Sequence, residues 1–451
     1  MDVERGKFWN PAVETMAREE LRELQLRRLR HQLDYAYHYS SFYRRRFDEA
    51  GLKPDDVKSL EDFEKVPMLY KDDLREERSR TGDPFGGILC VPLDERVVSI
   101  NASTGTTGIP TIFAYTKHDI MMGVEQEVRV KWSRGYRAGL RIYSTGFRWH
   151  GYVVLAYTGG DIIGYRGYLD CGYPLPYITA RHIQVLRNYK PEVFSAPILT
   201  LYSLLETAKK SGVDPKELFS ETKIIDTGYG DVVSVAVRKR LESETGVPSD
   251  KIYDFGGVAD PLWYWGDCPY HEGVHSCDDL FLAEVRDPES HERLTEGERG
   301  EVTVTNLFAE ATPIIKWGTE DIGSMTTEKC KCGRTHTRIS FLGREAFMAN
   351  IKGMKIFPTD VENILGDIPG FTEYFTIVKY SAGPMDVLRM KLAVDWDKVD
   401  DAEAFKAKLK ERLKERLGVE SEIEFVKSVS ELPFVGHKVV KLLDETKKQA
   451  A

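Results

Sequence analysis

Between residues 141 and 257 the chain alternates strand-like runs with helical stretches, and this alternation constrains the fold more than any other feature. The strand-like runs each end in a glycine or a loop, and they are IYSTGF, GYVVLAY, EVFSAPI, TKIIDTGYG and DKIYDFGG. Helical stretches over residues 198–211 and 231–246 separate several of them. Because strands that alternate with helices build layers of helix on sheet, the sequence predicts an α/β fold and not an all-β sandwich.

The part of the chain before this alternation is predicted to be helical. Over residues 11–47, leucines recur at three- and four-residue spacing with Arg and Glu between them, which is typical of a helix with one apolar face. A second short helical piece covers about 58–77 and is rich in Asp, Glu and Lys.

The part after residue 280 is β-rich at first, in the runs FLAEV, GEVTVTNL and TPIIKWG. The composition of the chain shifts after Gly343-Arg344. Two strand-like runs, YFTIVKY and RMKLAVD, precede an amphipathic helix at 401–417, which is followed by the run EIEFVKS and a Lys-rich tail. We therefore predict a large domain over residues 1–343 and a small α+β domain over residues 344–451.

Composition narrows the classes of partner. The formal net charge is −9, from 63 Lys plus Arg against 72 Asp plus Glu, so the chain lacks the basic footprint of a nucleic-acid binder. No run of 18 apolar residues is present, and the charged start predicts that there is no signal peptide. We expect a cytoplasmic protein with reduced cysteines and with neither nucleic acid nor membrane as a partner; a local basic pocket for a phosphate ligand stays open.

A loop rich in hydroxyls and glycines follows the strand-like run RVVSI and reads Asn101-Ala-Ser-Thr-Gly-Thr-Thr-Gly-Ile-Pro-Thr111. Glycine lets the backbone approach a phosphate, while backbone N–H groups and Thr hydroxyls donate hydrogen bonds to its oxygens. The loop is not a Walker loop, because the GxxxxGK[ST] spacing is absent. It indicates a phosphate site, and an ordinary Ser/Thr/Gly turn stays open as the alternative.

Cysteine and histidine residues form a second candidate site, in two clusters along the chain. Cys268 and His275 lie in GDCPYHEGVHSC, and Cys330 and Cys332 lie in KCKCG further along. Three thiolates and one imidazole make a tetrahedral set suited to Zn²⁺, and four protein ligands leave no open position, so such a site would be structural. Two rival ligands in the first cluster stay open, namely His271 and Cys277.

The hydroxyl-rich loop resembles the phosphate loop of the AMP-forming adenylate-forming enzymes, and the chain as a whole resembles their phenylacetate–CoA ligase branch. The resemblance continues in order through the following segments: RLRHQLDYAYHYSSFYRRRF, SLEDFEKVPMLYKDDLR, KIYDFGG, TPIIKWGTEDIG, CKCGRTHTRISFLGRE, IKGMKIFPTDVENIL and LPFVGHKVVKLLD. It implies a large multi-layer adenylate-forming N-terminal domain with a small mobile α+β C-terminal domain. Some members of this branch carry a structural zinc at positions that match the Cys/His set above.

This resemblance implies an AMP-forming carboxylate–CoA ligase that uses ATP, Mg²⁺ and CoA and activates an aromatic or small substituted carboxylic acid. The residues implied for ATP or AMP are Ser103, Thr104, Gly105, Thr106, Thr107, Gly108, Tyr253, Asp254, Asp321 and Arg344. The residues implied for the acyl pocket are Phe147, Trp149, His150, Pro197, Tyr229 and Gly256. The residues implied for CoA are Lys352, Gly353 and Lys355.

Individual roles follow from the same resemblance. Asp321 matches the carboxylate that accepts both ribose hydroxyls, which suits an ionised acid facing a diol. Tyr253 matches the aromatic residue against adenine, and Arg344 matches the arginine of the hinge region. Lys438 matches the catalytic lysine, whose ammonium offsets the negative charge that builds on phosphorus as the carboxylate attacks. Gly353 matches the glycine that lines the route of the thiol.

Four departures from the family pattern bear on these roles. Ile109 stands where the phosphate loop usually has Lys, so one partner for phosphate charge is missing. Gly257 stands where the family has the Glu that helps to hold Mg²⁺. Either Asp254 or Asp260 could supply a carboxylate instead, or the metal could rely more on phosphate and water. Tyr229 is bulky where the family is small, and the hinge position, often Asp, aligns with Ala346.

Two other functions stay open on the sequence alone. In one, the acyl-adenylate is passed to an amine, a hydroxyl or a carrier-protein thiol. In the other, the chain is a catalytically weak nucleotide-binding homologue, a reading that rests on Gly257 and Ile109. The sequence also leaves open whether the protein is a homodimer.

Overall fold

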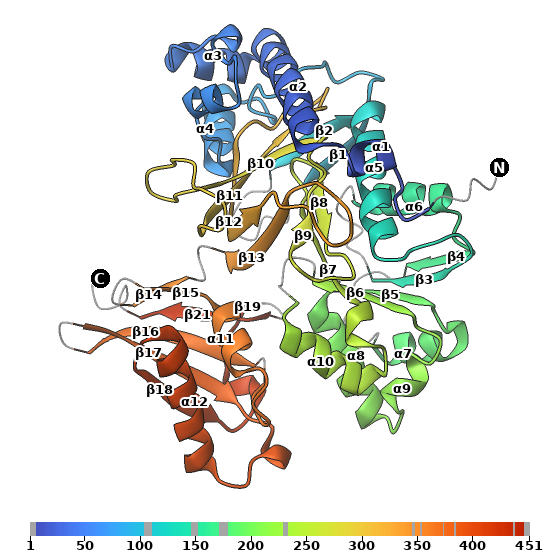
Figure 1. The fold of residues 1–451 in the computed structure, drawn as a ribbon, viewed down its shortest axis with the longest axis vertical. Helices are drawn as coiled ribbons and strands as arrows, with labels where there is room; N and C mark the ends of the chain where they lie inside the picture. The colour runs from blue at the N-terminus through green and yellow to red at the C-terminus, as the bar shows by residue number, and fades with distance from the viewer. Residues whose placement is uncertain are drawn as a thin grey trace. The chain divides into compact units, whose positions relative to one another are not determined.

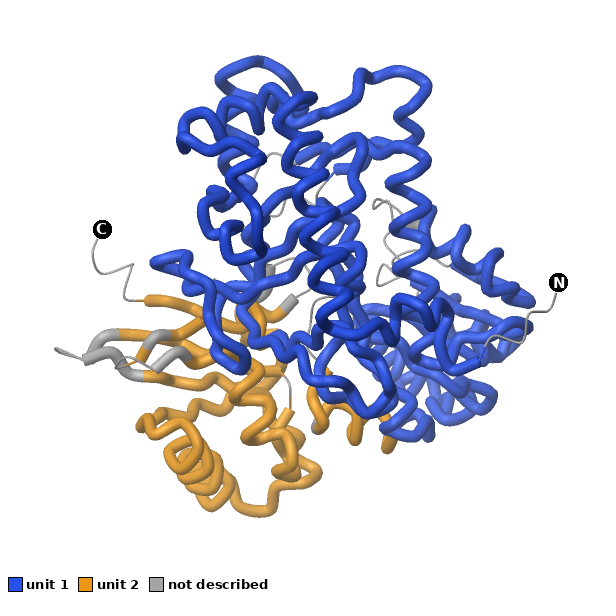
Figure 2. Tube along the Cα trace, turned by 45° about the horizontal axis from the view of Figure 1, so that its top comes forward, with its two compact units in different colours: residues 1–231, 244–341 blue, residues 232–243, 342–451 orange. Residues whose placement is uncertain are grey.

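The computed structural model of the 451-residue chain describes ten stretches of it. They are residues 6–102, 111–145, 152–170, 179–228, 233–344, 348–351, 354–372, 374–382, 385–435 and 438–445. The chain divides into two compact units, the first made of residues 1–231 and 244–341 and the second of residues 232–243 and 342–451 (Figure 2). The functional boundary predicted after residue 343 stays a prediction.

Helices open the first unit and then alternate with strands (Figure 1). The helices are α1 (Pro11–Glu14), α2 (Arg18–Tyr39), α3 (Ser41–Glu49), α4 (Lys71–Thr81), α5 (Lys117–Ser133), α6 (Tyr152–Ile163), α7 (Thr179–Tyr189), α8 (Ile198–Lys210) and α9 (Pro215–Leu218). Short 3₁₀ turns lie at Pro54–Asp56, Glu61–Lys65 and Ser249–Lys251. Helix α10 (Val235–Thr245) begins in the second unit's segment 232–243.

One large sheet organises the first unit. Its strands are β3 (Arg141–Ser144), β4 (Gly167–Asp170), β5 (Val193–Ser195), β6 (Ile224–Gly228), β7 (Ile252–Val258), β8 (Trp263–Gly266), β9 (Val274–His275), β10 (Phe281–Arg286), β11 (Gly300–Asn306), β12 (Trp317–Thr326) and β13 (Arg338–Arg344). They lie in the order β10-β11-β12-β13-β9-β8-β7-β6-β5-β3-β4. Strands β1 (Val97–Ala102) and β2 (Ile112–Thr116) form a separate antiparallel pair.

The sheet is parallel from β4 through β3, β5 and β6 to β7, and antiparallel where β7 meets β8. Parallel neighbours need crossover connections, and here helices supply them, which is the α/β arrangement predicted from the alternation. Because the strands run the same way, the carboxyl ends of β3, β5, β6 and β7 lie at one edge of the sheet. Ligands of open α/β sheets bind at such an edge.

Two of the predicted β runs differ from the structure. Of TPIIKWG, only Trp317 and Gly318 lie in a strand, at the start of β12. Residues 152–157 of the run GYVVLAY, predicted as a strand, belong to helix α6. A short apolar run fits a buried strand and a buried helix equally well, so periodicity could not decide. The helix packs closely against α5, where a Cβ at Gly159 would meet the Val128 side chain at 3.2 Å.

The predicted helix over residues 11–47 is found in three pieces. Between α2 and α3 the chain turns at Ser40, whose Oγ accepts a hydrogen bond from the Tyr43 backbone N–H and caps α3. Within the predicted piece at 58–77, residues 71–77 belong to α4. That helix begins where the Asp73 carboxylate accepts the Tyr70 backbone N–H at 2.7 Å, and it ends at Gly82, whose left-handed φ of 73° suits glycine.

The second unit has its own sheet and core. Its sheet has the order β18-β17-β16-β21, with β16 (Phe375–Ala382), β17 (Met385–Ala393), β18 (Ser421–Val426) and β21 (Leu442–Asp444). Helices α11 (Pro358–Leu365) and α12 (Ala402–Leu417) contribute Leu365, Leu409 and Leu413 to its apolar core. Two short hairpins complete it, β14 (Ala349–Ile351) with β15 (Met354–Ile356) and β19 (Phe434–Val435) with β20 (Lys438–Val439), together with 3₁₀ turns at Trp396–Lys398 and Val429–Glu431.

Among the described residues, no helix is both long and apolar enough to cross a membrane. The cytoplasmic location stays a prediction.

Candidate functional site

Backbone hydrogen bonds connect the segments that follow the parallel strands at the carboxyl edge of the sheet. Thr145, just after β3, donates its N–H to the Ser195 carbonyl at 3.0 Å, and Ala196, just after β5, donates to the Asp226 carbonyl at 3.0 Å. Pro197, predicted in the acyl pocket, follows directly and lies at the N-terminus of α8. Four other predicted acyl-pocket residues lie outside the described part of the chain, namely Phe147, Trp149, His150 and Tyr229.

A buried ion pair that the sequence analysis missed supports this edge. The Asp226 carboxylate on β6 pairs with Arg134 Nη2 at 3.0 Å and accepts the Tyr136 hydroxyl at 2.9 Å, and the side chains of the pair are 1% and 0% exposed. Burial raises the pKa of Asp226 to about 6, although Arg134 and the Tyr136 hydrogen bond act in the opposite direction. No sequence motif marks this pair, because Arg134 follows α5 while Asp226 lies far along the chain on β6.

Strand β7 carries three of the predicted nucleotide and acyl residues. Tyr253 is 1% exposed, and its ring lies 5.4 Å from that of His271. Asp254 stands opposite Thr227 in the register of β6 and β7. Gly256 is packed so closely against Trp265 that a Cβ would lie 2.9 Å from the indole nitrogen. What these three residues bind stays a prediction.

The next residue, Gly257, explains the missing family carboxylate. Gly257 faces Tyr264 across the β7–β8 pairing, and a Cβ at this position would lie 2.3 Å from the Tyr264 ring and 2.7 Å from the Trp263 carbonyl oxygen. Real carbon contacts are near 3.5–4.0 Å, so the hairpin has no room for a side chain here. Of the two carboxylates that could act instead, Asp260 is 4% exposed and paired with Lys71 at 3.1 Å. Asp254 is half-buried on β7.

Asp321 and Arg344 lie in β12 and β13. Asp321 is half-buried, and its backbone N–H donates to the Thr319 hydroxyl at 3.2 Å. Glu320 before it has a φ of 61° and donates its N–H to Glu301 at 3.0 Å, which fixes the backbone from which Asp321 projects. Arg344 ends β13 and is exposed.

For the remaining predicted residues, the structure describes either the backbone alone or nothing. Lys438 pairs with Val435 in the β19–β20 hairpin, and Lys355 lies in β15 opposite Asn350. Several predicted residues lie outside the described part of the chain, namely Ser103, Thr104, Gly105, Thr106, Thr107, Gly108, Lys352 and Gly353.

The four residues of the predicted metal set are brought together. Cys268 follows β8, His275 lies in β9, and Cys330 and Cys332 lie in the loop before β13; all four are buried, and their ligand atoms lie within 4.8 Å of one another. The Cys268 and Cys330 sulfurs are 3.7 Å apart, and Cys332 Sγ lies 3.5 Å from His275 Nε2. A tetrahedral ion with Zn–S of about 2.3 Å and Zn–N of about 2.0 Å separates such pairs by about 3.8 and 3.5 Å.

The two rival ligands lie elsewhere. His271 Nδ1 pairs with the Asp267 carboxylate at 2.5 Å, and neither His271 nor Cys277 belongs to the group of four. The thiol pKa values within the group are shifted in opposite directions: the hydrogen bond with Cys332 raises the pKa of Cys268, and burial raises the pKa of Cys330. The hydrogen bond with Cys268, reinforced by His275, holds the pKa of Cys332 well below its ordinary value. Burial lowers the pKa of His275, which favours the neutral imidazole that a metal needs.

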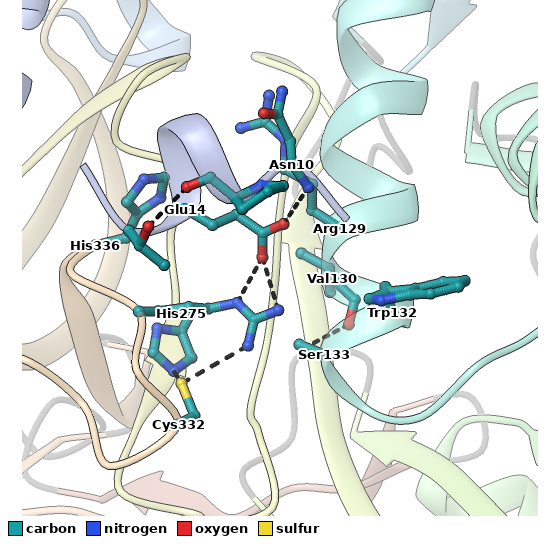
Figure 3. Close-up of polar contacts among 12 residues, drawn as sticks. Asn10, Glu14, Arg129, Val130, Trp132, Ser133, His275, Cys332 and His336 are labelled. Carbon is teal, nitrogen blue, oxygen red and sulfur yellow. Dashed lines mark hydrogen bonds and ion pairs between the residues drawn. The ribbon is translucent and has the colours of Figure 1, made fainter. Parts of the chain in front are cut away.

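The same loop holds the N-terminal segment (Figure 3). Arg334 Nη1 donates to Cys332 Sγ at 3.7 Å, while its other nitrogens contact the Glu14 carboxylate at 2.6 and 2.8 Å. The His336 ring contacts the Val13 carbonyl at 2.8 Å. The loop that carries Cys330 and Cys332, together with Arg334 and His336 (the Cys/His loop), therefore anchors helix α1. The sequence analysis did not predict this connection.

Comparison with known proteins places these features in context. Residues 353–446 match the AMP-binding enzyme C-terminal domain family. The phenylacetate-coenzyme A ligase of Thermus thermophilus is 34% identical over 393 residues, which cover 86% of this chain and 84% of that protein. The phenylacetate-coenzyme A ligase of Escherichia coli is 28% identical over 422 residues, 92% of both chains.

Solved structures of CoA ligases share the fold of this chain. A crystal structure of 2-hydroxyisobutyryl-CoA ligase, in the postadenylation state with an acyl-AMP, superposes with a TM-score of 0.86 at 26% identity and covers 99% of this chain and 94% of that one. An anthranilate CoA ligase in complex with anthranoyl-AMP shares the fold, with a TM-score of 0.57 at 16% identity over 76% of this chain and 66% of that one. The predicted large α/β domain with a small C-terminal domain is thus confirmed at the level of fold.

Proposed function

The chain belongs to the phenylacetate–CoA ligase family of AMP-forming acyl-CoA synthetases, and from this premise we propose that its substrate is an aromatic or small substituted carboxylic acid. The enzyme is an ATP-dependent acid–CoA ligase, as predicted. The observation that carries this conclusion is 34% identity over 86% of the chain to a phenylacetate-coenzyme A ligase.

The reaction has two steps. In the first, a carboxylate oxygen of the acid attacks the α-phosphorus of ATP, and pyrophosphate leaves to give the acyl-adenylate. In the second, the sulfur of CoA attacks the acyl carbon, AMP leaves, and the thiol proton is released as the thioester forms. Both steps develop negative charge on oxygen, so positioned cations and hydrogen-bond donors lower their barriers.

We assign residues to these steps on the motif matches. Asp321 would accept the ribose hydroxyls, Tyr253 would lie near adenine, and the loop from Ser103 to Gly108 would hold the phosphates. Lys438 would contact the acid carboxylate and the α-phosphate in the first step. Gly353 would line the thiol route in the second.

Magnesium requires a different carboxylate from the family's usual one, since Gly257 has no room for a side chain. We propose Asp254 for this role, because it is a half-buried acid on β7, the strand that carries Gly257. One or two carboxylates, with water and substrate phosphates, are the usual ligands of Mg²⁺ in such sites.

We propose Zn²⁺ for the Cys268, His275, Cys330 and Cys332 set. Its support is the match between the two ligand separations, 3.7 and 3.5 Å, and those of a tetrahedral Zn²⁺ site. Four protein ligands close such a site, so the metal would stabilise the Cys/His loop and the α1 segment that this loop anchors, and it would not take part in acid activation.

The choice of acid is tested by acid-dependent ATP–pyrophosphate exchange. The panel pairs the acids named for the relatives, phenylacetate and 2-hydroxyisobutyrate, with benzoate and acetate. Exchange with phenylacetate or 2-hydroxyisobutyrate well above that with acetate supports the proposed class. Exchange with acetate alone would contradict it. Thioester formation in the second step must require free CoA; transfer without CoA would favour an amine, hydroxyl or carrier-protein acceptor.

A further inference from the structure

The side chain of Arg334 links the N-terminal segment of the chain to the Cys/His set, which consists of Cys268, His275, Cys330 and Cys332. Its Nη1 donates to Cys332 Sγ at 3.7 Å, and its Nε and Nη2 contact one Glu14 carboxylate oxygen at 2.8 and 2.6 Å (Figure 3). The Arg334 and Glu14 side chains are 6% and 2% exposed. A buried charge that loses its partner is costly, so this ion pair fixes the direction of the guanidinium.

Glu14 is itself held in place by α1. Its other carboxylate oxygen accepts the Asn10 backbone N–H at 2.7 Å, at the residue before the helix. The ring of Phe8, in the same N-terminal segment, faces the guanidinium of Arg334 with its centroid 5.1 Å from Cζ, within the range of a cation–π contact. The N-terminal segment therefore holds Arg334 at its edge through Glu14 and at its face through Phe8.

The charge of the Cys/His set explains why the direction of this guanidinium matters. Three thiolates and a neutral imidazole around a divalent ion leave one negative charge in excess, and all four ligands are buried. Such a charge is stable in a protein interior only where cations or N–H groups face it. Arg334 supplies one such N–H to Cys332, and Glu14 offsets the charge of the guanidinium.

We propose that Arg334 is a positioning residue of the metal site and that Glu14 acts on the metal through Arg334, so that the docked N-terminal segment tightens metal binding. This assignment rests on the proposed function, since it takes the Cys/His set as a Zn²⁺ site. Outer-shell contacts of this kind typically change metal affinity about tenfold to a hundredfold. Because such coupling is reciprocal, the bound metal stabilises the docked N-terminal segment by the same factor.

The test is the zinc affinity of the full-length, metal-loaded protein, measured by equilibrium competition with a chromophoric chelator. The variants are Arg334→Met, Glu14→Ala and the double variant. Each single change is expected to weaken zinc binding about tenfold to a hundredfold. The double variant should lose no more affinity than Arg334→Met alone, because Glu14 has no route to the metal once the guanidinium is gone. Glu14→Gln should recover part of the loss, since an amide oxygen still accepts from Arg334.

Arg18→Met is the matched control. Arg18 also joins the N-terminal part of the chain to the segment after β9, through an ion pair with Asp278 at 2.6 Å, and neither residue belongs to the Cys/His set. The zinc affinity of Arg18→Met should stay at the parent value, although its ion pair is lost.

A second readout separates positioning from loss of stability. Cobalt(II) in place of zinc gives the site a thiolate-to-metal charge-transfer band, and an N–H that donates to the thiolate raises the energy of this band. In folded, cobalt-loaded Arg334→Met and Glu14→Ala the band should move to longer wavelength, and in Arg18→Met it should not move. A variant that is only less stable would keep the parent band, because the contact at Cys332 would be unchanged.

The outcomes separate this assignment from the Zn²⁺ proposal. If the parent carries zinc but Arg334→Met keeps the parent affinity and band, the assignment is wrong and the Zn²⁺ proposal stands. Losses that multiply in the double variant, or an equal loss in Arg18→Met, would also overturn it, because Glu14 would then act independently of Arg334 or through general stability. If the parent holds neither zinc nor cobalt, the Zn²⁺ proposal fails and this assignment fails with it. If Arg334→Met or Glu14→Ala does not fold, Arg334→Lys and Glu14→Gln carry the same comparison.

Discussion

Restoring the family carboxylate by Gly257→Glu should damage this enzyme. The added Cβ would lie 2.3 Å from the Tyr264 ring and 2.7 Å from the Trp263 carbonyl oxygen, against ordinary contacts near 3.5–4.0 Å. The ring and the carbonyl belong to paired strands, in which Gly257 stands opposite Tyr264 and Val258 opposite Trp263, so neither can move without disturbing the ladder.

Overpacking of this kind costs about 1–3 kcal/mol, and a backbone oxygen among the contacts puts this site near the upper figure. A loss of about 3 kcal/mol lowers the folding equilibrium constant of the first unit about a hundredfold. Guanidinium unfolding followed by tryptophan fluorescence is the suitable assay, because Trp263 and Trp265 flank the site.

The control is Gly6→Ala, since a Cβ at Gly6 meets nothing within 4 Å and the unfolding midpoint should not change. Gly257→Ala should show most of the destabilisation seen with Glu, because the Cβ itself makes the clash. An unchanged midpoint for Gly257→Glu together with faster pyrophosphate exchange would refute this reasoning and would show that the position is open to a magnesium ligand.

Three further outcomes follow from the assigned roles. Lys438→Ala should slow acyl-adenylate formation about 10²–10³-fold, by analogy with the loss of one oxyanion donor, while thioester formation from pre-made acyl-adenylate continues. Equal rates of acyl-adenylate formation in the variant and the parent would show that Lys438 has no role in the first step. Gly353→Leu should do the reverse, blocking thioester formation and sparing adenylation, and no effect on either step would indicate that CoA is not the acceptor. The parent should carry about one Zn²⁺ per chain by metal analysis, and Cys330→Ser with Cys332→Ser should lose it and speed proteolysis near residue 14; unchanged metal content in the double variant would refute the site.

The sequence predicted the parts of the fold whose signals are local. The runs at β3, β5, β6 and β7 end in glycine or loops, and the structure confirms that each contains a strand. The error at residues 152–157 arose because a short apolar run carries no period that separates helix from strand. The break at Ser40 has a local signal in the sequence, since a serine followed by a new helical run is typical of an N-cap.

In the candidate site, too, the residues with a local sequence signal were predictable and those that depend on distant contacts were not. The sequence predicts the set of three cysteines and one histidine because metal-binding spacing is visible in it, and the fold brings those four residues together. The closed space at Gly257 could not be predicted, because it depends on Tyr264 across a strand pairing.

The central claim is that this enzyme joins a carboxylic acid to CoA through an acyl-adenylate. The most direct measurement follows both half-reactions with phenylacetate and 2-hydroxyisobutyrate: acid-dependent exchange of labelled pyrophosphate into ATP without CoA, then thioester and AMP formation after CoA is added. The account predicts exchange that requires an acid, followed by AMP and thioester in equal amounts. Formation of ADP, or a thioester without prior pyrophosphate exchange, would contradict it.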